Sequence, residues 1–165
     1  MNKKETFIFE NIPNDLSELK LLKEANLNNP FETAALTVLA LCRYCDDNAS
    51  GIEMLNFLKG PQPLNPYEQQ FLKDRLTGKK YLPYSYFDGA TSENNYTPSM
   101  PFTITVQEDP YSYTEEGYAK LLIKSSGADQ PRPIKLRQKG KEQWFQWEQF
   151  LLSDIKPPIE SDPWS

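Results

Sequence analysis

The sequence of 165 residues predicts an α+β fold, in which an N-terminal helical half packs on a C-terminal antiparallel sheet. Three observations predict it. Up to about residue 80, apolar residues recur at the three- and four-residue spacing of helices. Beyond that point they alternate, with many β-branched and aromatic residues, and the runs are joined by short links. We therefore expect one domain over residues 1–165, with about four helices covering a meander of about four strands.

The helical part is predicted over about residues 12–78, after a short opening strand at 6–11. Its strongest helix follows Asn29, because asparagine caps helix N-termini and Pro30 suits the first helical position. Apolar residues cover more than one side of this helix, which predicts that it is buried at the centre of the helical part. The other helix ends are predicted from the same residue types: Asn14 or Ser17 at the first start, Asn48 and Gly60 around the next helix, and Asn65, Pro66 and Gly78 around the last.

The sheet part is predicted over residues 102–152, and a tail follows at 153–165. Lys139-Gly140 indicates a hairpin turn between the last two strands, since glycine adopts positive φ at low cost. Short links between successive strands favour antiparallel pairing. The predicted strands are 102–108, 118–125, 133–139 and 142–150.

The last strand carries two tryptophans. Strict alternation places Trp144, with Gln146 and Glu148, on one face of the sheet, and Trp147, with Phe145, on the other. Large aromatic residues on both faces indicate that both are at least partly covered. The alternative is a pocket lined by Trp144 or Trp147, near Tyr118, in which Arg132 and Arg137 hold an anion.

An aromatic connection at 79–101 joins the two parts. Its stretch "YLPYSYFDGATSENNYTPSMPF" holds four tyrosines, three prolines and two charged side chains. A tyrosine ring suits a binding surface, because it offers a flat face and a polar tip, and it suits a seam between helices and sheet for the same reason. We expect most of these rings to point inward, with a few tips outside; a binding surface is the alternative.

The chain contains no histidine, which removes Ser-His-Asp triads, Cys-His dyads and histidine metal sites. The pair of cysteines in "CRYC" has redox spacing, but it lies near a helix C-terminus and precedes Asp46 and Asp47. Both influences disfavour a thiolate, so we interpret Cys42 and Cys45 as core residues rather than redox or metal-binding ones. No nucleotide-binding glycine pattern is present, and we expect no cofactor and no metal site.

The net charge of −5 and the pI of about 4.9 argue against a nucleic-acid partner, which favours a basic surface. No apolar run approaches the length of a membrane span, and the N-terminus lacks the apolar core of a signal peptide. These features predict a cytoplasmic protein.

Five segments form a recognisable set: "NPFETAALTVLALCRY", "GIEMLNFLKGPQPLNPYEQQFLKDR", "YLPYSYFDGATSENNYTPSMPFTI", "RPIKLRQKGKEQWFQWEQFLL" and "DPWS". Together they resemble a family of small, uncharacterised bacterial proteins, a domain of unknown function found mainly among Gram-positive anaerobes. The likeness covers about residues 5–165 and implies an intracellular, single-domain protein, with no catalytic residue to carry over. The order of the last four strands also resembles the curved sheet of the nuclear-transport-factor-2-like fold, although more helices precede the sheet here.

The missing histidine and cofactor motifs, together with the aromatic connection, favour a non-catalytic binding or protein-interaction module with a protein or small-molecule partner. Two alternatives stay open: an enzyme that acts through paired carboxylates, and a small-molecule carrier on a curved sheet. Replacing Tyr84, Tyr86 and Tyr96 together would test the binding surface, since unfolding would assign the rings to the core. The candidate binding residues are Tyr84, Tyr86, Tyr96, Tyr111, Tyr113, Arg137, Trp144 and Trp147.

Overall fold

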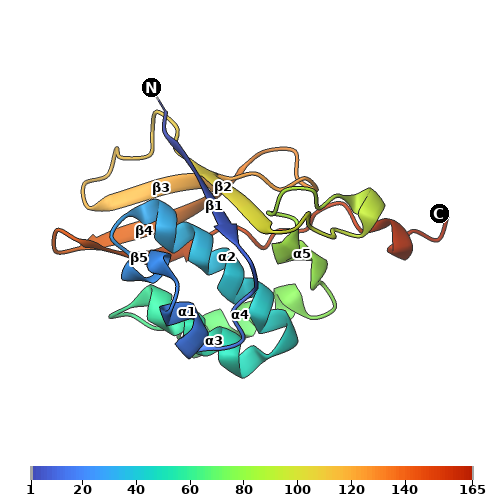
Figure 1. Ribbon diagram of the computed structural model, residues 1–165, viewed down its shortest axis with the longest axis horizontal. Coiled ribbons are helices and arrows are strands. Elements are labelled where there is room, and N and C mark those ends of the chain that lie inside the picture. The colour runs from blue at the N-terminus through green and yellow to red at the C-terminus, as the bar shows by residue number, and fades with distance from the viewer. Residues whose placement is uncertain (1, 165) are drawn as a thin grey trace.

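A five-stranded antiparallel sheet with a layer of helices against one face makes up the computed structural model, which describes residues 2–164 (Figure 1). The α+β prediction is confirmed, with five α-helices and five strands in the described chain. The helices are α1 (Leu16–Lys20), α2 (Pro30–Asp46), α3 (Asn48–Lys59), α4 (Pro66–Leu76) and α5 (Tyr81–Tyr84). The strands are β1 (Lys4–Phe9), β2 (Phe102–Gln107), β3 (Tyr118–Ile123), β4 (Arg132–Lys139) and β5 (Gln143–Gln149). Short 3₁₀ turns lie at Lys23–Asn26, Ser92–Asn94 and Ile159–Ser161.

The strand order is β1-β2-β3-β4-β5, so the opening strand joins the sheet as a fifth member at one edge. It pairs antiparallel with β2, from Lys4 opposite Gln107 to Phe9 opposite Phe102. Alternation explains its place, because Phe7 and Phe9 are buried on the helix side while Ile8 between them is exposed.

Helix α2 is the centre of the molecule, as its apolar surface predicts. Thirteen of its 17 residues are buried, and it contacts strands β2 to β5 as well as α3 and α5. Asn29 caps it as predicted, because its side chain accepts the backbone N–H of Glu32 at 3.0 Å. Buried residues from both parts of the chain belong to one hydrophobic cluster around this helix.

The predicted N-terminal cap is confirmed at α4 but wrong at α1 and at α3. Asn65 and Glu68 form a reciprocal capping box at the start of α4. At α1 the cap is Asp15 rather than Asn14 or Ser17, and at α3 it is Asp47 rather than Asn48. In each case, the carboxylate accepts the N–H three residues ahead, since the aspartate has the extended backbone that a cap requires.

The alternation predicted for the last strand is also wrong in part, because β5 contains a bulge. Leu136 lies opposite Gln146 while Lys135 lies opposite Glu148, so Trp147 is an extra residue on the bulged strand. Glu148 therefore shares the outer face with Lys135, instead of sharing the helix-facing side with Gln146. The bulge leaves Trp147 against Arg137 on the outer face.

The glycine that ends α3 gives the first testable prediction. Gly60 has φ of +64°, and a Cβ there would lie 2.5 Å from the Phe145 ring, so Gly60→Ala adds a clash to the backbone strain. We expect a loss of about 3 kcal/mol in the free energy of unfolding. Gly78 also has positive φ, +74°, but nothing lies within 4 Å of its added Cβ, so Gly78→Ala should lose only about 1 kcal/mol. Urea unfolding followed by tryptophan fluorescence measures both; equal losses would show that the ring contact contributes nothing.

Candidate functional site

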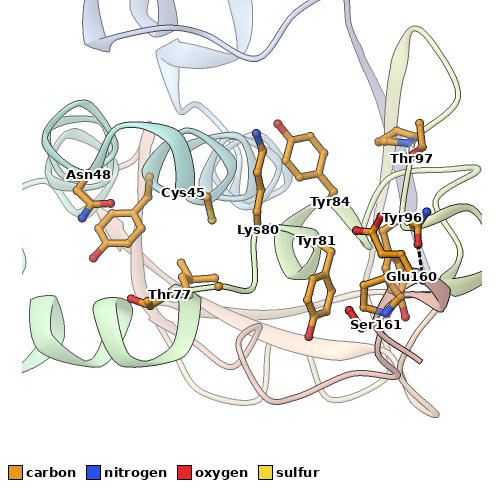
Figure 2. A pocket seen from close by; sticks show the side chains of 16 residues that line it. Cys45, Asn48, Thr77, Lys80, Tyr81, Tyr84, Tyr96, Thr97, Glu160 and Ser161 are labelled. Carbon is orange, nitrogen blue, oxygen red and sulfur yellow. Dashed lines mark hydrogen bonds between the residues drawn. The ribbon is translucent and has the colours of Figure 1, made fainter. Parts of the chain in front are cut away.

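The aromatic connection lines a cleft of about 680 Å³, with residues from α2, α3, α4 and the C-terminal tail (Figure 2). We call it the tyrosine cleft, after Tyr44, Tyr81, Tyr84 and Tyr96. In Figure 2, Tyr81 and Tyr84 lie between Cys45 on one side and the tail, with Glu160 and Ser161, on the other. The local sequence places them there, because a single turn of helix over residues 81–84 brings side chains three residues apart to neighbouring positions.

The four rings have different supports. Tyr81 stacks on Tyr96 with ring centres 5.6 Å apart, and Tyr84 packs against Phe87 and Phe102. The hydroxyl of Tyr96 donates to the carbonyl oxygen of Lys156 at 2.5 Å. Within residues 2–164, the hydroxyls of Tyr44, Tyr81 and Tyr84 form no hydrogen bond. The cleft therefore contains three phenolic groups that are free to bind a ligand.

One edge of the cleft has a strained backbone. Asn95 and Tyr96 both adopt left-handed conformations, with φ of 57° and 56°. A bulky residue in this region costs about 1–3 kcal/mol and persists only where its surroundings fix it. Here the backbone N–H of Tyr96 donates to Thr91 at 2.7 Å, and the side-chain oxygen of Asn95 accepts the N–H of Glu160 at 3.0 Å. The tail is thereby attached to the strained turn.

The cleft is close to electrically neutral. Lys80 and Glu160 are the charged side chains among its sixteen lining residues, and Lys80 forms an ion pair with Asp46 at 2.6 Å. Burial raises the pKa of the Tyr84 hydroxyl, with smaller contributions from Cys42 and Asp46, so Tyr84 stays a neutral donor at physiological pH. An uncharged ligand with apolar and hydrogen-bonding groups suits this lining.

A second group of predicted residues meets on the outer face of the sheet. The guanidinium carbon of Arg137 lies 4.6 Å from the centre of the Trp147 ring and 5.6 Å from that of Tyr118. The two rings themselves make an edge contact at 6.0 Å. Lys135 lies over the other side of this group, 4.6 Å from the Tyr118 ring, and pairs with Glu115 at 2.5 Å. Cation–π contacts of this kind fix the direction of the arginine side chain.

A family model described as a domain of unknown function (DUF6935) matches residues 11–159, which is most of the chain. The chain belongs to this family. No curated protein and no solved structure matches it. Within residues 2–164, no helix is long and apolar enough to cross a membrane.

The structure separates the candidate residues of the aromatic connection. Tyr84 is half-buried and lines the tyrosine cleft, whereas Tyr86 and Tyr96 are only 3% and 2% exposed. The Tyr86 hydroxyl donates to the Leu151 carbonyl at 2.5 Å and so supports the core. Replacing Tyr84, Tyr86 and Tyr96 together would therefore remove core packing as well as cleft surface.

The other candidates lie in three different environments. Tyr111 and Tyr113 are exposed on the loop between β2 and β3 and contribute to neither group. Trp144 is half-buried, and its backbone bonds to Leu27 and to the Thr33 hydroxyl. Arg137 and Trp147 meet on the outer sheet face, as the pocket alternative expected, but Arg132 does not join them. The guanidinium of Arg132 is occupied by the carbonyls of Leu151, Ser153 and Asp154, where the sheet part passes into the tail.

Sequence reasoning missed the cleft residues that come from helix ends and from the tail. Asn48 starts α3, Thr77 follows α4 and Lys80 precedes α5. Pro158 and Glu160 lie near the C-terminus. No local pattern brings these segments together. The proline pair in the tail is the one sequence feature that could have indicated a docked tail, since prolines favour an extended, rigid backbone.

The two cysteines are free thiols, with Cys42 buried and Cys45 partly so. Burial raises the pKa of Cys42 well above its usual value, and burial followed by Asp46 raises that of Cys45 to about 12. Both remain protonated at neutral pH, and the protonated thiol is a poor nucleophile and a poor metal ligand.

The thiols predict a loss of stability at alkaline pH. The unfolded chain releases the Cys45 proton near the ordinary pKa of 9.0, whereas the folded chain releases it near 12. The folded state therefore binds this proton more tightly, and the free energy of unfolding falls as pH rises from about 9 towards 12. Urea unfolding between pH 7 and 10.5 should show a shallower fall for Cys45→Ala than for the native protein. Parallel pH profiles would contradict the raised pKa.

Proposed function

We propose that this chain is a non-catalytic protein-interaction module of the bacterial cytoplasm, and that its tyrosine cleft binds an extended, proline-containing peptide. The family likeness supports an origin among Gram-positive anaerobes. The acidic composition and the two free thiols support a reducing cytoplasm, because disulfides persist mainly in oxidising compartments. The interaction role, the cytoplasmic location and the bacterial origin are all part of the proposal.

The observation that carries the proposal is the way the cleft holds the protein's own tail. Pro158 lies buried in the cleft lining with φ of −61° and ψ of 151°, the conformation of a polyproline II helix. Two residues earlier, the Lys156 carbonyl accepts the hydrogen bond from Tyr96. Proline-rich ligands dock in aromatic grooves in this way, with tyrosine hydroxyls donating to backbone carbonyls. The tail thus serves as a model for the ligand.

The part of the cleft that the tail does not fill also offers tyrosine rings and hydroxyl donors. The rings of Tyr81 and Tyr84 are half-buried, and their hydroxyls, together with that of Tyr44, form no hydrogen bond within residues 2–164. A polyproline II segment presents unpaired carbonyls and loses little conformational entropy on binding. The near-neutral lining also favours a segment without charge.

The carboxylate-enzyme alternative finds little support in this cleft. Glycoside hydrolysis by paired carboxylates needs two acids that face each other across the site. Among the sixteen lining residues, Glu160 is the one carboxylate, and the sequence has no histidine to act as a general base. Binding therefore accounts for the lining better than turnover does.

Removing cleft hydroxyls tests the proposal. Fluorescence anisotropy with a fluorescein-labelled decaproline peptide should detect saturable binding, and Tyr81→Phe with Tyr84→Phe should weaken it about tenfold, because two hydrogen bonds of about 0.5–1.5 kcal/mol each are lost. These hydroxyls bond to nothing in the described chain, so the double variant should stay folded. Tyr67→Phe is the matched control, since Tyr67 is 80% exposed on α4 and lies outside the cleft.

A Gly-Ser peptide of the same length should bind at least tenfold more weakly. Equal binding of both peptides, or no effect of the double variant, would refute the proline-peptide assignment. Binding of cellohexaose in place of either peptide would assign the cleft to carbohydrate instead.

A further inference from the structure

A second pocket, of about 280 Å³, lies where the end of α3 approaches the β4–β5 hairpin. It shares no residue with the tyrosine cleft. We call it the basic pocket, because Lys59, Arg137 and Lys139 line it and no carboxylate does. Its apolar walls come from Phe145 and Trp147.

Lys59 is a buried ammonium with two partners, a carboxylate and a backbone carbonyl. Its side chain is only 5% exposed, and lysine is almost never buried to this extent without partners. Its Nζ lies 3.3 Å from a carboxylate oxygen of Glu68 and 3.3 Å from the Trp147 carbonyl. Charge-assisted hydrogen bonds are usually 2.7–2.9 Å long, and an ammonium has three donors. Two of its three donors therefore have partners among the described residues, and the third is available to an anionic group.

Arg137 and Lys139 lack partners of opposite charge within residues 2–164. The face of the Arg137 guanidinium is covered by Trp147 at 4.6 Å, which leaves its N–H edge free. A guanidinium whose plane is fixed by stacking is pre-organised for two parallel hydrogen bonds to an oxyanion. Lys139 precedes the hairpin glycine and is exposed beside it.

Three features oppose an anion here. Glu148 lines an adjoining pocket together with Lys59, Glu68 and Trp147. The C-terminal end of α3 carries a partial negative charge of about one half, and Glu68 compensates part of the Lys59 charge. The dipole acts only over the last turn, whereas both Arg137 and Lys139 keep a full unpaired charge. The cations outweigh the opposing charges.

We infer that the basic pocket binds the phosphate group of a small ligand. An arginine edge together with ammonium groups matches the geometry and charge of phosphate oxygens. The volume lies at the small end of ligand pockets, so it suits phosphate with a short body packed on Phe145 and Trp147. This site is independent of the function proposed for the tyrosine cleft.

Calorimetry of the full chain at low salt tests the inference, with inorganic phosphate, glycerol 3-phosphate and succinate as probes. Low ionic strength is needed because salt screens exposed charges. We expect saturable binding of both phosphate probes, tighter for glycerol 3-phosphate, and at least tenfold weaker binding for Arg137→Gln. Lys120→Gln removes the same charge from an exposed residue on the same sheet face, outside the pocket, and should change binding less than twofold.

Three results would overturn the inference: no saturable binding of either phosphate probe at 10 mM, equal losses in Arg137→Gln and Lys120→Gln, or succinate binding as tightly as phosphate. The last two would indicate a general positive surface. Urea unfolding of each variant checks that it is folded, and none of these outcomes depends on whether decaproline binds the tyrosine cleft.

Discussion

The burial of α2 on nearly all sides is the constraint on which the rest of the structure depends. A helix with 13 buried residues out of 17 requires cover from several elements, and the sheet alone covers only one side. The remaining cover comes from the 3₁₀ turn before α2, from α3 and from α5. The tyrosine cleft lies where this cover ends, because Tyr44 and Cys45 belong to the last turn of α2. The tyrosine cleft thus forms at the C-terminal end of α2, where the covering elements stop.

Local chemistry predicted most of the secondary structure. Asn29 and Asn65 were found from capping preferences alone, since each side chain bonds to a backbone group only three residues away. The caps at Asp15 and Asp47 were missed, because adjacent residues in "NDLS" and "DDNAS" suit a cap equally well on sequence grounds. The bulge at Trp147 could not be predicted either, since it depends on pairing with β4.

The candidate sites were harder to predict, because both are formed by segments that are far apart in the chain. Burial divided the tyrosines of one short stretch into cleft residues and core residues, as Tyr84 and Tyr86 show. The sequence did not indicate Lys59 as a site residue, although it did indicate Arg137 and Trp147. Helix α3 joins the two sites physically. Asn48 at its start lines the tyrosine cleft, and Lys59 at its end, about 16 Å away along the helix, lines the basic pocket.

The pairing of β1 with β2 has a consequence for how the protein is made. Residues 4–9 find their neighbours only at residues 102–107, so this strand has no partner until the intervening segment has left the ribosome. Its phenylalanines, 7 and 9, would face solvent during that time. Unpaired apolar strands are prone to self-association, so this strand is a point at which the nascent chain is exposed to aggregation early in translation.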